Sequence, residues 1–81
     1  MAQNMEEAVA MLVKGLVRNP EQVEVRAMPR DGKTTILEIY VAEGDVGPLI
    51  GRQGRTIKSL RAIFDAIGQK HHHRFILEIV E

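Results

Sequence analysis

The chain has 81 residues, which is room for one domain over residues 1–81, because a domain of this size buries only about 60 to 65% of its surface in a single core. Its composition, 44% hydrophobic and 27% charged, excludes disordered and fibrous proteins, and the absence of cysteine excludes disulfides, thiolate metal ligands and cysteine nucleophiles. The formal net charge of zero argues against a uniformly basic nucleic-acid binder.

The first predicted element is a helix that begins after Asn4. Asn4 is a favourable N-cap, and Glu7 stands three residues later, as in a capping box. Apolar residues then recur at helical spacing until Asn19-Pro20 stops the run. The residues of this stripe are Met5, Ala8, Val9, Leu12, Val13 and Leu16.

A β-hairpin is predicted next. Residues 22–28 alternate between apolar and polar, residues 30–33 supply a turn, and residues 34–42 alternate again. In the second strand Leu37, Ile39 and Val41 are expected to face the core, which leaves Ile36, Glu38 and Tyr40 on the other face.

Two helices and a strand complete the series. Asp45 is predicted to cap a short helix over residues 46–50, with Pro48 in its first turn. A longer helix begins near Arg55, and Gly68 is predicted to be its C-cap. The apolar stripe of that helix contains Ile57, Leu60, Ile63, Phe64 and Ile67, and residues 74–80 read as the last strand.

The order helix, strand, strand, helix, helix, strand predicts an α+β domain. Return from the second strand to the third through two helices requires a crossover, and if these strands pair in parallel it is right-handed. We therefore expect a three-stranded mixed sheet with the helices packed on one face.

Basic residues are concentrated in one part of the chain. Residues 51–74 carry six of them, Arg52, Arg55, Lys58, Arg61, Lys70 and Arg74, against Asp65 alone. Residues 1–50 carry five basic and eight acidic residues. Because local potential governs the encounter with a polyanion, this segregation favours nucleic-acid binding despite the neutral sum.

The loop Gly51-Arg52-Gln53-Gly54 lies at the start of this basic segment. Two glycines let a backbone approach a sugar-phosphate chain closely, and the N–H groups at the start of the following helix point at phosphate oxygens. The sequence has neither a dinucleotide fingerprint nor a phosphate-loop motif.

The loop resembles the G-x-x-G loop of K homology (KH) domains, which clamps about four nucleotides of a single strand. The element order resembles the type II KH fold, and the whole chain resembles the small bacterial proteins made of one KH domain, through Glu43 to Gly47 and Leu49 to Ile57. Pro48 departs from that pattern, where a lysine or similar polar residue is expected, which puts a contact from this position in doubt. The resemblance implies low-specificity RNA binding, an RNA-chaperone role and a Jag-type KH partner.

We predict a site made of three parts. Gly51 and Gly54 bring the backbone close, Arg52 and Gln53 add charge and hydrogen bonds, and Arg55 and Lys58 extend the cationic track along the helix. Bases are expected in an aliphatic groove between the short helix and the second strand, with Val46, Leu49 or Ile50 as its lining. No residue is identified as a reader of the 2′-hydroxyl, so single-stranded RNA and single-stranded DNA both remain open as ligands.

Two other features have competing interpretations. His71, His72 and His73 suggest a metal site, but neighbours in an extended segment alternate sides and no other ligand completes a set, so a solvated entry to the last strand is favoured and no metal or cofactor is expected. Ile36, Tyr40, Ile76 and Val80 would form an exposed apolar patch on the outer face of the sheet, where the chain could form a homodimer or a heteromer.

The leading prediction is thus a non-enzymatic RNA-binding module. The alternative is a protein-interaction scaffold with a KH-like fold that has lost RNA binding. An enzyme is disfavoured because no set of nucleophile, base and orienting group is found. The chain has no apolar run near the roughly 20 residues that span a bilayer and no signal peptide, so we expect a cytoplasmic protein without a membrane partner.

Overall fold

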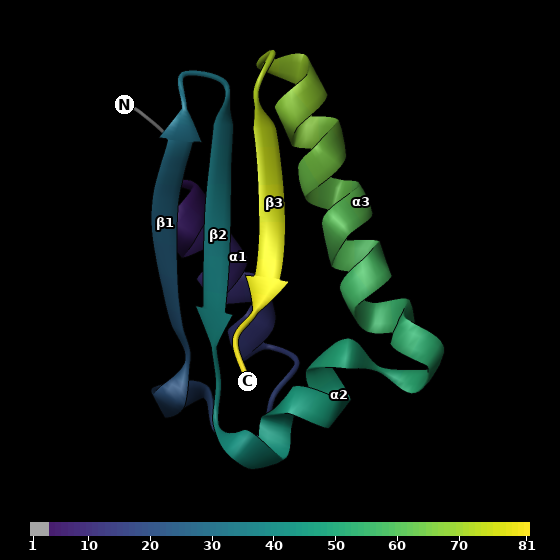
Figure 1. Ribbon diagram of the computed structural model, residues 1–81. Coiled ribbons are helices and arrows are strands. Elements are labelled where there is room, and N and C mark those ends of the chain that lie inside the picture. Colours follow the sequence, from purple (N-terminus) through teal and green to yellow (C-terminus); the bar gives the residue numbers. More distant parts are fainter. Residues whose placement is uncertain (1–3) are drawn as a thin grey trace.

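The computed structural model describes residues 4–81 (Figure 1). Its main elements are α1 (Met5–Lys14), β1 (Glu24–Asp31), β2 (Thr34–Tyr40), α2 (Val46–Ile50), α3 (Arg55–Lys70) and β3 (Arg74–Ile79). Three single-turn 3₁₀ segments join them, η1 (Pro20–Gln22), η2 (Glu43–Asp45) and η3 (Arg52–Gly54). This order confirms the predicted α+β architecture of the type II KH fold. No helix within residues 4–81 is long and apolar enough to cross a membrane.

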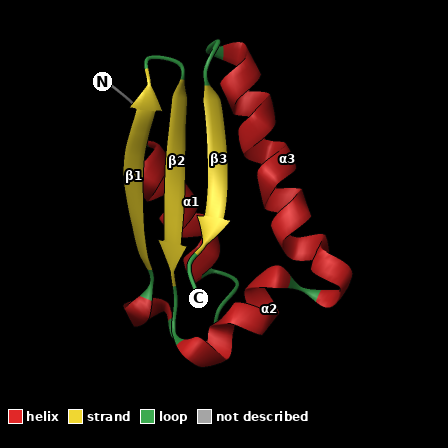
Figure 2. Ribbon diagram, viewed as in Figure 1, coloured by secondary structure: helices red, strands yellow, loops and turns green. Residues whose placement is uncertain are grey.

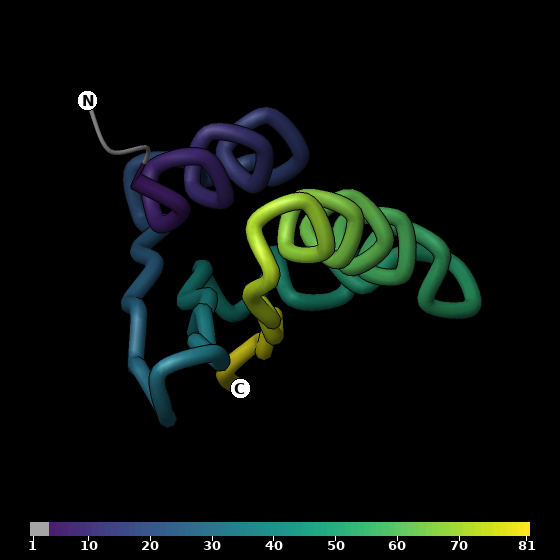
Figure 3. The backbone as a smooth tube through the Cα atoms, turned by 90° about the horizontal axis from the view of Figure 1, so that it is seen from above, coloured from purple at the N-terminus to yellow at the C-terminus, as the bar shows by residue number. Residues whose placement is uncertain are grey.

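The sheet is mixed, as predicted. Its strand order is β1-β2-β3, with β1 antiparallel and β3 parallel to the central strand β2 (Figure 2). A view from above shows α1 and α3 on the same side of the sheet (Figure 3). The register places Ile36 of β2 between Met28 of β1 and Ile76 of β3, so each strand contributes alternate residues to the two faces.

The core lies between the sheet and the helices. Its buried members come from α1 (Val9 and Val13), β2 (Leu37 and Ile39), α2 (Leu49), α3 (Ile57, Leu60 and Phe64) and β3 (Leu77). The inward positions predicted for β2 are confirmed by Leu37 and Ile39, which are fully buried. At the start of α1, the Asn4 side chain accepts hydrogen bonds from the amides of Glu6 and Glu7, so the predicted cap is also confirmed.

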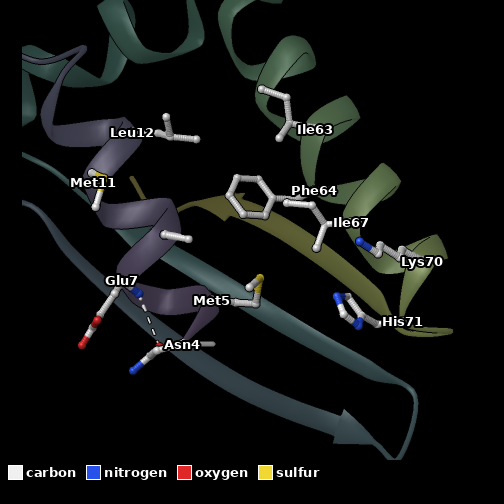
Figure 4. Close-up of a pocket in the computed structure, with 11 residues that line it drawn as sticks. Asn4, Met5, Glu7, Met11, Leu12, Ile63, Phe64, Ile67, Lys70 and His71 are labelled. Atoms are coloured by element: carbon white, nitrogen blue, oxygen red, sulfur yellow. Dashed lines mark hydrogen bonds between the residues drawn. The ribbon is translucent and has the colours of Figure 1, made fainter. Parts of the chain in front are cut away.

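Three residues predicted to belong to the buried stripes are instead exposed. The exposed fractions are 40% for Leu12, 45% for Leu16 and 46% for Ile63. Leu16 lies beyond Lys14, where α1 ends, so this helix is shorter than predicted. For Leu12 and Ile63, periodicity identified the apolar side of the helix, but α1 and α3 rest on the sheet through narrower faces than the stripes suggest. Leu12 and Ile63 face each other across the space between the helices (Figure 4). We call this space, lined by Met11, Leu12, Leu16, Ile63 and Ile67, the interhelical groove; it comprises two hollows of about 720 and 500 Å³.

The outer face of the sheet is less apolar than predicted. Ile36 and Ile76 are neighbours, as expected, but a row of charged residues, Arg26, Glu38 and Glu78, separates them from Tyr40. The Tyr40 hydroxyl donates to Glu38 Oε1 at 2.9 Å, and the Arg26 guanidinium lies 4.8 Å from the centre of the Tyr40 ring. Among the exposed large apolar side chains, Met28 lies on β1 next to Ile36, whereas Met11, Leu12 and Ile63 lie on the helices and Leu16 follows α1.

The C-terminal end of α3 also differs from the prediction. Gly68 lies inside the helix, which continues to Lys70, and the left-handed residue of the turn is His72, with φ of 53°. A Cβ at Gly68 would collide with the carbonyl oxygen of His73, whose amide donates to Gly68 O at 2.8 Å. Gly68 is thus required by close packing of the returning chain and not by a positive φ.

Asp45 is buried and does not cap α2 with its side chain, contrary to the prediction. Its carboxylate accepts hydrogen bonds from the Arg18 amide at 3.2 Å, the Asn19 amide at 3.0 Å and Asn19 Nδ2 at 3.1 Å. Desolvation raises the pKa of this carboxyl group, but the hydrogen bonds from Asn19 and Arg18 outweigh it, so the pKa lies below its usual value. Asp45 therefore joins the segment before α2 to the segment after α1.

Replacement of Asp45 by Asn is expected to destabilise the fold at neutral pH. The folded pKa is lower than the unfolded one, so the ionised carboxylate stabilises the protein above the unfolded pKa of about 3.9, and this stability is lost as the pH falls through the folded pKa. Urea unfolding should give a lower midpoint for Asp45→Asn at pH 7, with a difference that shrinks in acid. The exposed Glu43→Gln is the control and should match wild type at pH 7; a midpoint difference for Asp45→Asn that is independent of pH would contradict this assignment.

Candidate nucleic-acid interface

The predicted loop forms a tight reversal between α2 and α3, at the corner farthest from β1 (Figure 1). Three of its four residues have positive φ, 80° at Gly51, 56° at Gln53 and 74° at Gly54. The Gly51 amide donates to Gly47 O at 2.9 Å and closes α2, and the Gly54 amide donates to Gly51 O at 3.0 Å and closes the loop. The loop is therefore a defined turn.

The two glycines are needed for different reasons. Gly51 has φ of 80° and ψ of 169°, a region that is essentially restricted to glycine, and a Cβ there would collide with the Thr56 side chain. Gly54 has the left-handed conformation, and a Cβ there would meet only Lys58 Cε at 3.7 Å. Gly51 thus determines the turn itself, whereas Gly54 keeps the surface of the turn bare.

Fewer backbone amides are free than the sequence suggested. Gly51 and Gly54 use theirs within the turn, and the Arg55 amide donates to Arg52 O. Within residues 4–81, the Arg52 and Gln53 amides donate no hydrogen bond to the protein. The loop therefore offers a ligand two backbone donors at its tip.

The predicted polar side chains are brought together at this corner. Arg52, Gln53, Arg55 and Lys58 are all exposed, and Arg55 Nη2 donates to Gln53 Oε1 at 3.4 Å. Arg61 was not predicted as a site residue, although its spacing of three from Lys58 places it on the same side of α3. Its Nε donates to Leu77 O of β3 at 3.3 Å, so it lies over the edge of the sheet.

The aliphatic part of the site needs a correction. Leu49 is fully buried and packs in the core, so it supports α2 and offers no surface to a base, whereas Val46 and Ile50 are partly exposed. A hollow of about 440 Å³ does lie where the second helix meets the ends of the strands, lined by Val41, Val46, Val80, Glu43 and Glu81. The two carboxylates of this groove, Glu43 and Glu81, were not predicted as part of the site.

The three histidines diverge. His71 follows the end of α3, His72 occupies the left-handed turn position, and His73 is partly buried. His73 Nε2 lies 2.8 Å from Thr35 Oγ1, and its ring centre is 4.7 Å from that of Phe75. The prediction of a solvated entry to β3 therefore holds for His71 and His72 and is wrong for His73, which joins β3 to β2.

Comparison with known proteins places this sequence in a family. The family description "KhpA/KhpB, KH domain" matches residues 6–79. This chain belongs to that family. A relative from Chlamydia trachomatis named RNA-binding protein KhpA is 39% identical over 77 residues, which cover 95% of this chain and 97% of the relative.

Two further relatives come from distant bacteria. The RNA-binding protein KhpA of Aquifex aeolicus is 38% identical over 95% of this chain and 96% of its own length, and that of Listeria monocytogenes is 38% identical over 95% and 100%. No solved structure matches the chain. The KhpA/KhpB match includes α2, the loop and α3, so the predicted KH resemblance is confirmed over nearly the whole chain.

Substitution of the two loop glycines should have unequal effects on stability. Gly51→Ala is expected to lower the free energy of unfolding by about 3 kcal/mol, because it combines a forbidden φ with a clash, and Gly54→Ala by about 1 kcal/mol, the cost of a left-handed alanine. Gly44→Ala is the control, since a Cβ there meets nothing within 4 Å. Denaturant unfolding measures all three; equal losses at Gly51 and Gly54 would contradict the assigned roles.

Proposed function

We propose that this chain binds single-stranded RNA through residues 51–54 and the adjoining turn of α3, without catalytic chemistry. The observation that carries the proposal is the exposed loop tip, where the Arg52 and Gln53 amides donate no hydrogen bond within the described residues and the cationic side chains of Arg52 and Arg55 are exposed. The name of the relatives, RNA-binding protein KhpA, supports RNA over DNA as the ligand.

The geometry favours recognition of the backbone over recognition of sequence. Phosphates would lie against the two loop amides and the cations Arg52, Arg55 and Lys58, while bases would rest on Val46 and Ile50. Three or four phosphate contacts on a single strand give a log-log salt slope of roughly −2 to −3. Such binding suits a low-specificity RNA chaperone or adaptor that acts in the cytoplasm.

Stacking on aromatic rings contributes little to this interface. Phe64 is buried in the core, Phe75 is partly buried beside His73, and Tyr40 is covered by Arg26 on the outer face of the sheet. These are the three aromatic residues of the chain, so bases are left with aliphatic and guanidinium surfaces. Affinity is accordingly modest and depends strongly on salt.

Replacement of Arg52 and Gln53 by Asp should abolish binding of a labelled single-stranded RNA and leave the thermal midpoint nearly unchanged, because both side chains are exposed. Lys14→Asp with Gln22→Asp is the matched control, since it makes the same change of charge at exposed sites away from the loop. Fluorescence anisotropy at low salt is the measurement. Retained affinity in the loop variant would refute the RNA site and favour the alternative, a scaffold that no longer binds RNA.

We further propose that the interhelical groove is the association surface, and that its occupant is a second copy of this chain. Its apolar lining carries Glu7 and Lys70 at the rim, two charges of opposite sign that a two-fold axis can pair between copies. A heteromer with a Jag-type KH protein, the partner that the family resemblance implies, would use the same groove. This surface replaces the one predicted on the outer face of the sheet.

Ile63→Glu should give a lighter species than wild type in sedimentation, because it places a charge among the apolar side chains of the groove. Ile63 is 46% exposed, so the folded monomer should tolerate the change. Ala62→Glu, at an exposed position of the same helix that lines neither hollow, is the control and should sediment like wild type. A monomeric wild type that gains mass only when a Jag-type protein is added would assign the groove to the heteromer, and unchanged mass in Ile63→Glu would remove the idea.

A further inference from the structure

Two turns that are far apart in the sequence lie together at the end of the molecule opposite the loop. One connects β1 to β2 and the other connects α3 to β3, and Figure 1 shows both at the top of the sheet. The Arg74 amide donates to Lys33 O at 2.7 Å, and His73 Nε2 lies 2.8 Å from Thr35 Oγ1. These contacts fix the turns side by side, so their side chains form one surface, which we call the distal end.

The distal end is basic. Arg30 near the end of β1, Lys33 in the hairpin turn and Arg74 at the start of β3 are all exposed at this end, together with the carboxylate of Asp31. That carboxylate is held by the Lys33 amide at 2.8 Å, and this hydrogen bond lowers its pKa, so it remains charged and within its own turn. The formal balance is three positive charges against one negative, with Asp65 on the adjoining side of α3, and this excess favours a polyanion at a site that the loop does not occupy.

One side of α3 connects the loop to the distal end. Lys58, Arg61, Asp65 and Gln69 follow each other at spacings of three and four along this side, next to the free edge of β3. Arg61 binds the β3 carbonyl of Leu77, and a polar hollow of about 330 Å³ lined by Asp65, Gln69, His73 and Arg74 lies at the far end. The helix has 16 residues and spans about 24 Å, several nucleotides beyond the segment that the loop holds.

We infer that the distal end is a second phosphate-binding site, and that a single RNA strand held by the loop continues along the α3–β3 side to reach it. The inference rests on the proposed RNA binding of the loop and extends it to longer ligands. Arg61, Arg74 and Lys33 are the successive cations of this path, and Asp65 is the carboxylate that lies within it. A short strand occupies only the loop, whereas a long strand uses both sites.

Lys33→Gln combined with Arg74→Gln tests the distal end, because both side chains are exposed and only their backbone atoms join the turns. Anisotropy titrations would use single-stranded RNA of five and of fifteen nucleotides at several salt concentrations. The variant should bind the five-nucleotide strand like wild type and the fifteen-nucleotide strand more weakly, with a salt slope shallower by about 1.4, at about 0.7 for each lost phosphate contact. Lys14→Gln with Arg18→Gln is the matched control and should leave both strands unaffected.

A second variant predicts a gain. Asp65→Asn removes the carboxylate from the path and should tighten binding of the fifteen-nucleotide strand without changing that of the short one. Equal affinity and slope for the distal variant and wild type on the long strand would overturn the inference, even if the loop variant Arg52→Asp with Gln53→Asp still abolishes binding of both strands. If that loop variant retains affinity for the short strand, the proposed function of the loop fails instead.

Discussion

The position of the glycine loop depends on a buried carboxylate that is not part of it. Asp45 accepts three hydrogen bonds from Arg18 and Asn19 and thereby fixes the start of α2 against the chain that leaves α1. Four residues later Leu49 is fully buried in the core, so the five-residue helix is held at both of its ends. Gly51, with φ of 80°, then reverses the chain. If the proposed RNA binds here, a loop tip that is exposed and held in this way would lower the conformational entropy lost on binding.

The long helix α3 separates two surfaces of different chemistry. Towards α1 it presents Ile63 and Ile67 to the interhelical groove, and towards the free edge of β3 it presents Lys58 and Arg61. Between them Phe64 and Leu60 are buried against the sheet. Because these surfaces flank the same buried stripe, the proposed association through the groove and the proposed RNA contact along the other side would be compatible in one molecule.

The order of elements could be predicted from the sequence because it is encoded locally. Alternation in β2, the Asn4 cap and the two glycines of the loop each act within a few residues of their own position. The role of Asp45 could not be predicted, since its partners lie 26 and 27 residues away and an aspartate before a short helix is a normal N-cap.

Other misses depend on the distances between elements. The exposure of Leu12 and Ile63 follows from how far α1 stands from α3, which periodicity does not specify. Leu49 was predicted to line the groove because α2 is apolar on several sides, and only packing decides which side is buried. Gly68 was predicted to be a C-cap because glycine is common at that position. In the structure, glycine is needed there because the carbonyl oxygen of His73, across the turn, leaves no space for a Cβ.

Neutral net charge is compatible with binding of a polyanion because of where the carboxylates lie. Electrostatic interactions are screened over about 8 Å at physiological salt, and the molecule is 34 Å long, so Glu24 and Glu38 on the outer face of the sheet have little influence at the loop. Glu43 and Glu81 are different, since they line the groove beside α2. In the proposed complex, they would disfavour phosphates there and leave that groove to bases, whose amino groups can donate to carboxylates. In the proposed complex, the acidic groove and the cationic side of α3 would therefore favour one orientation of the strand, with its phosphates towards α3 and its bases towards the ends of β2 and β3.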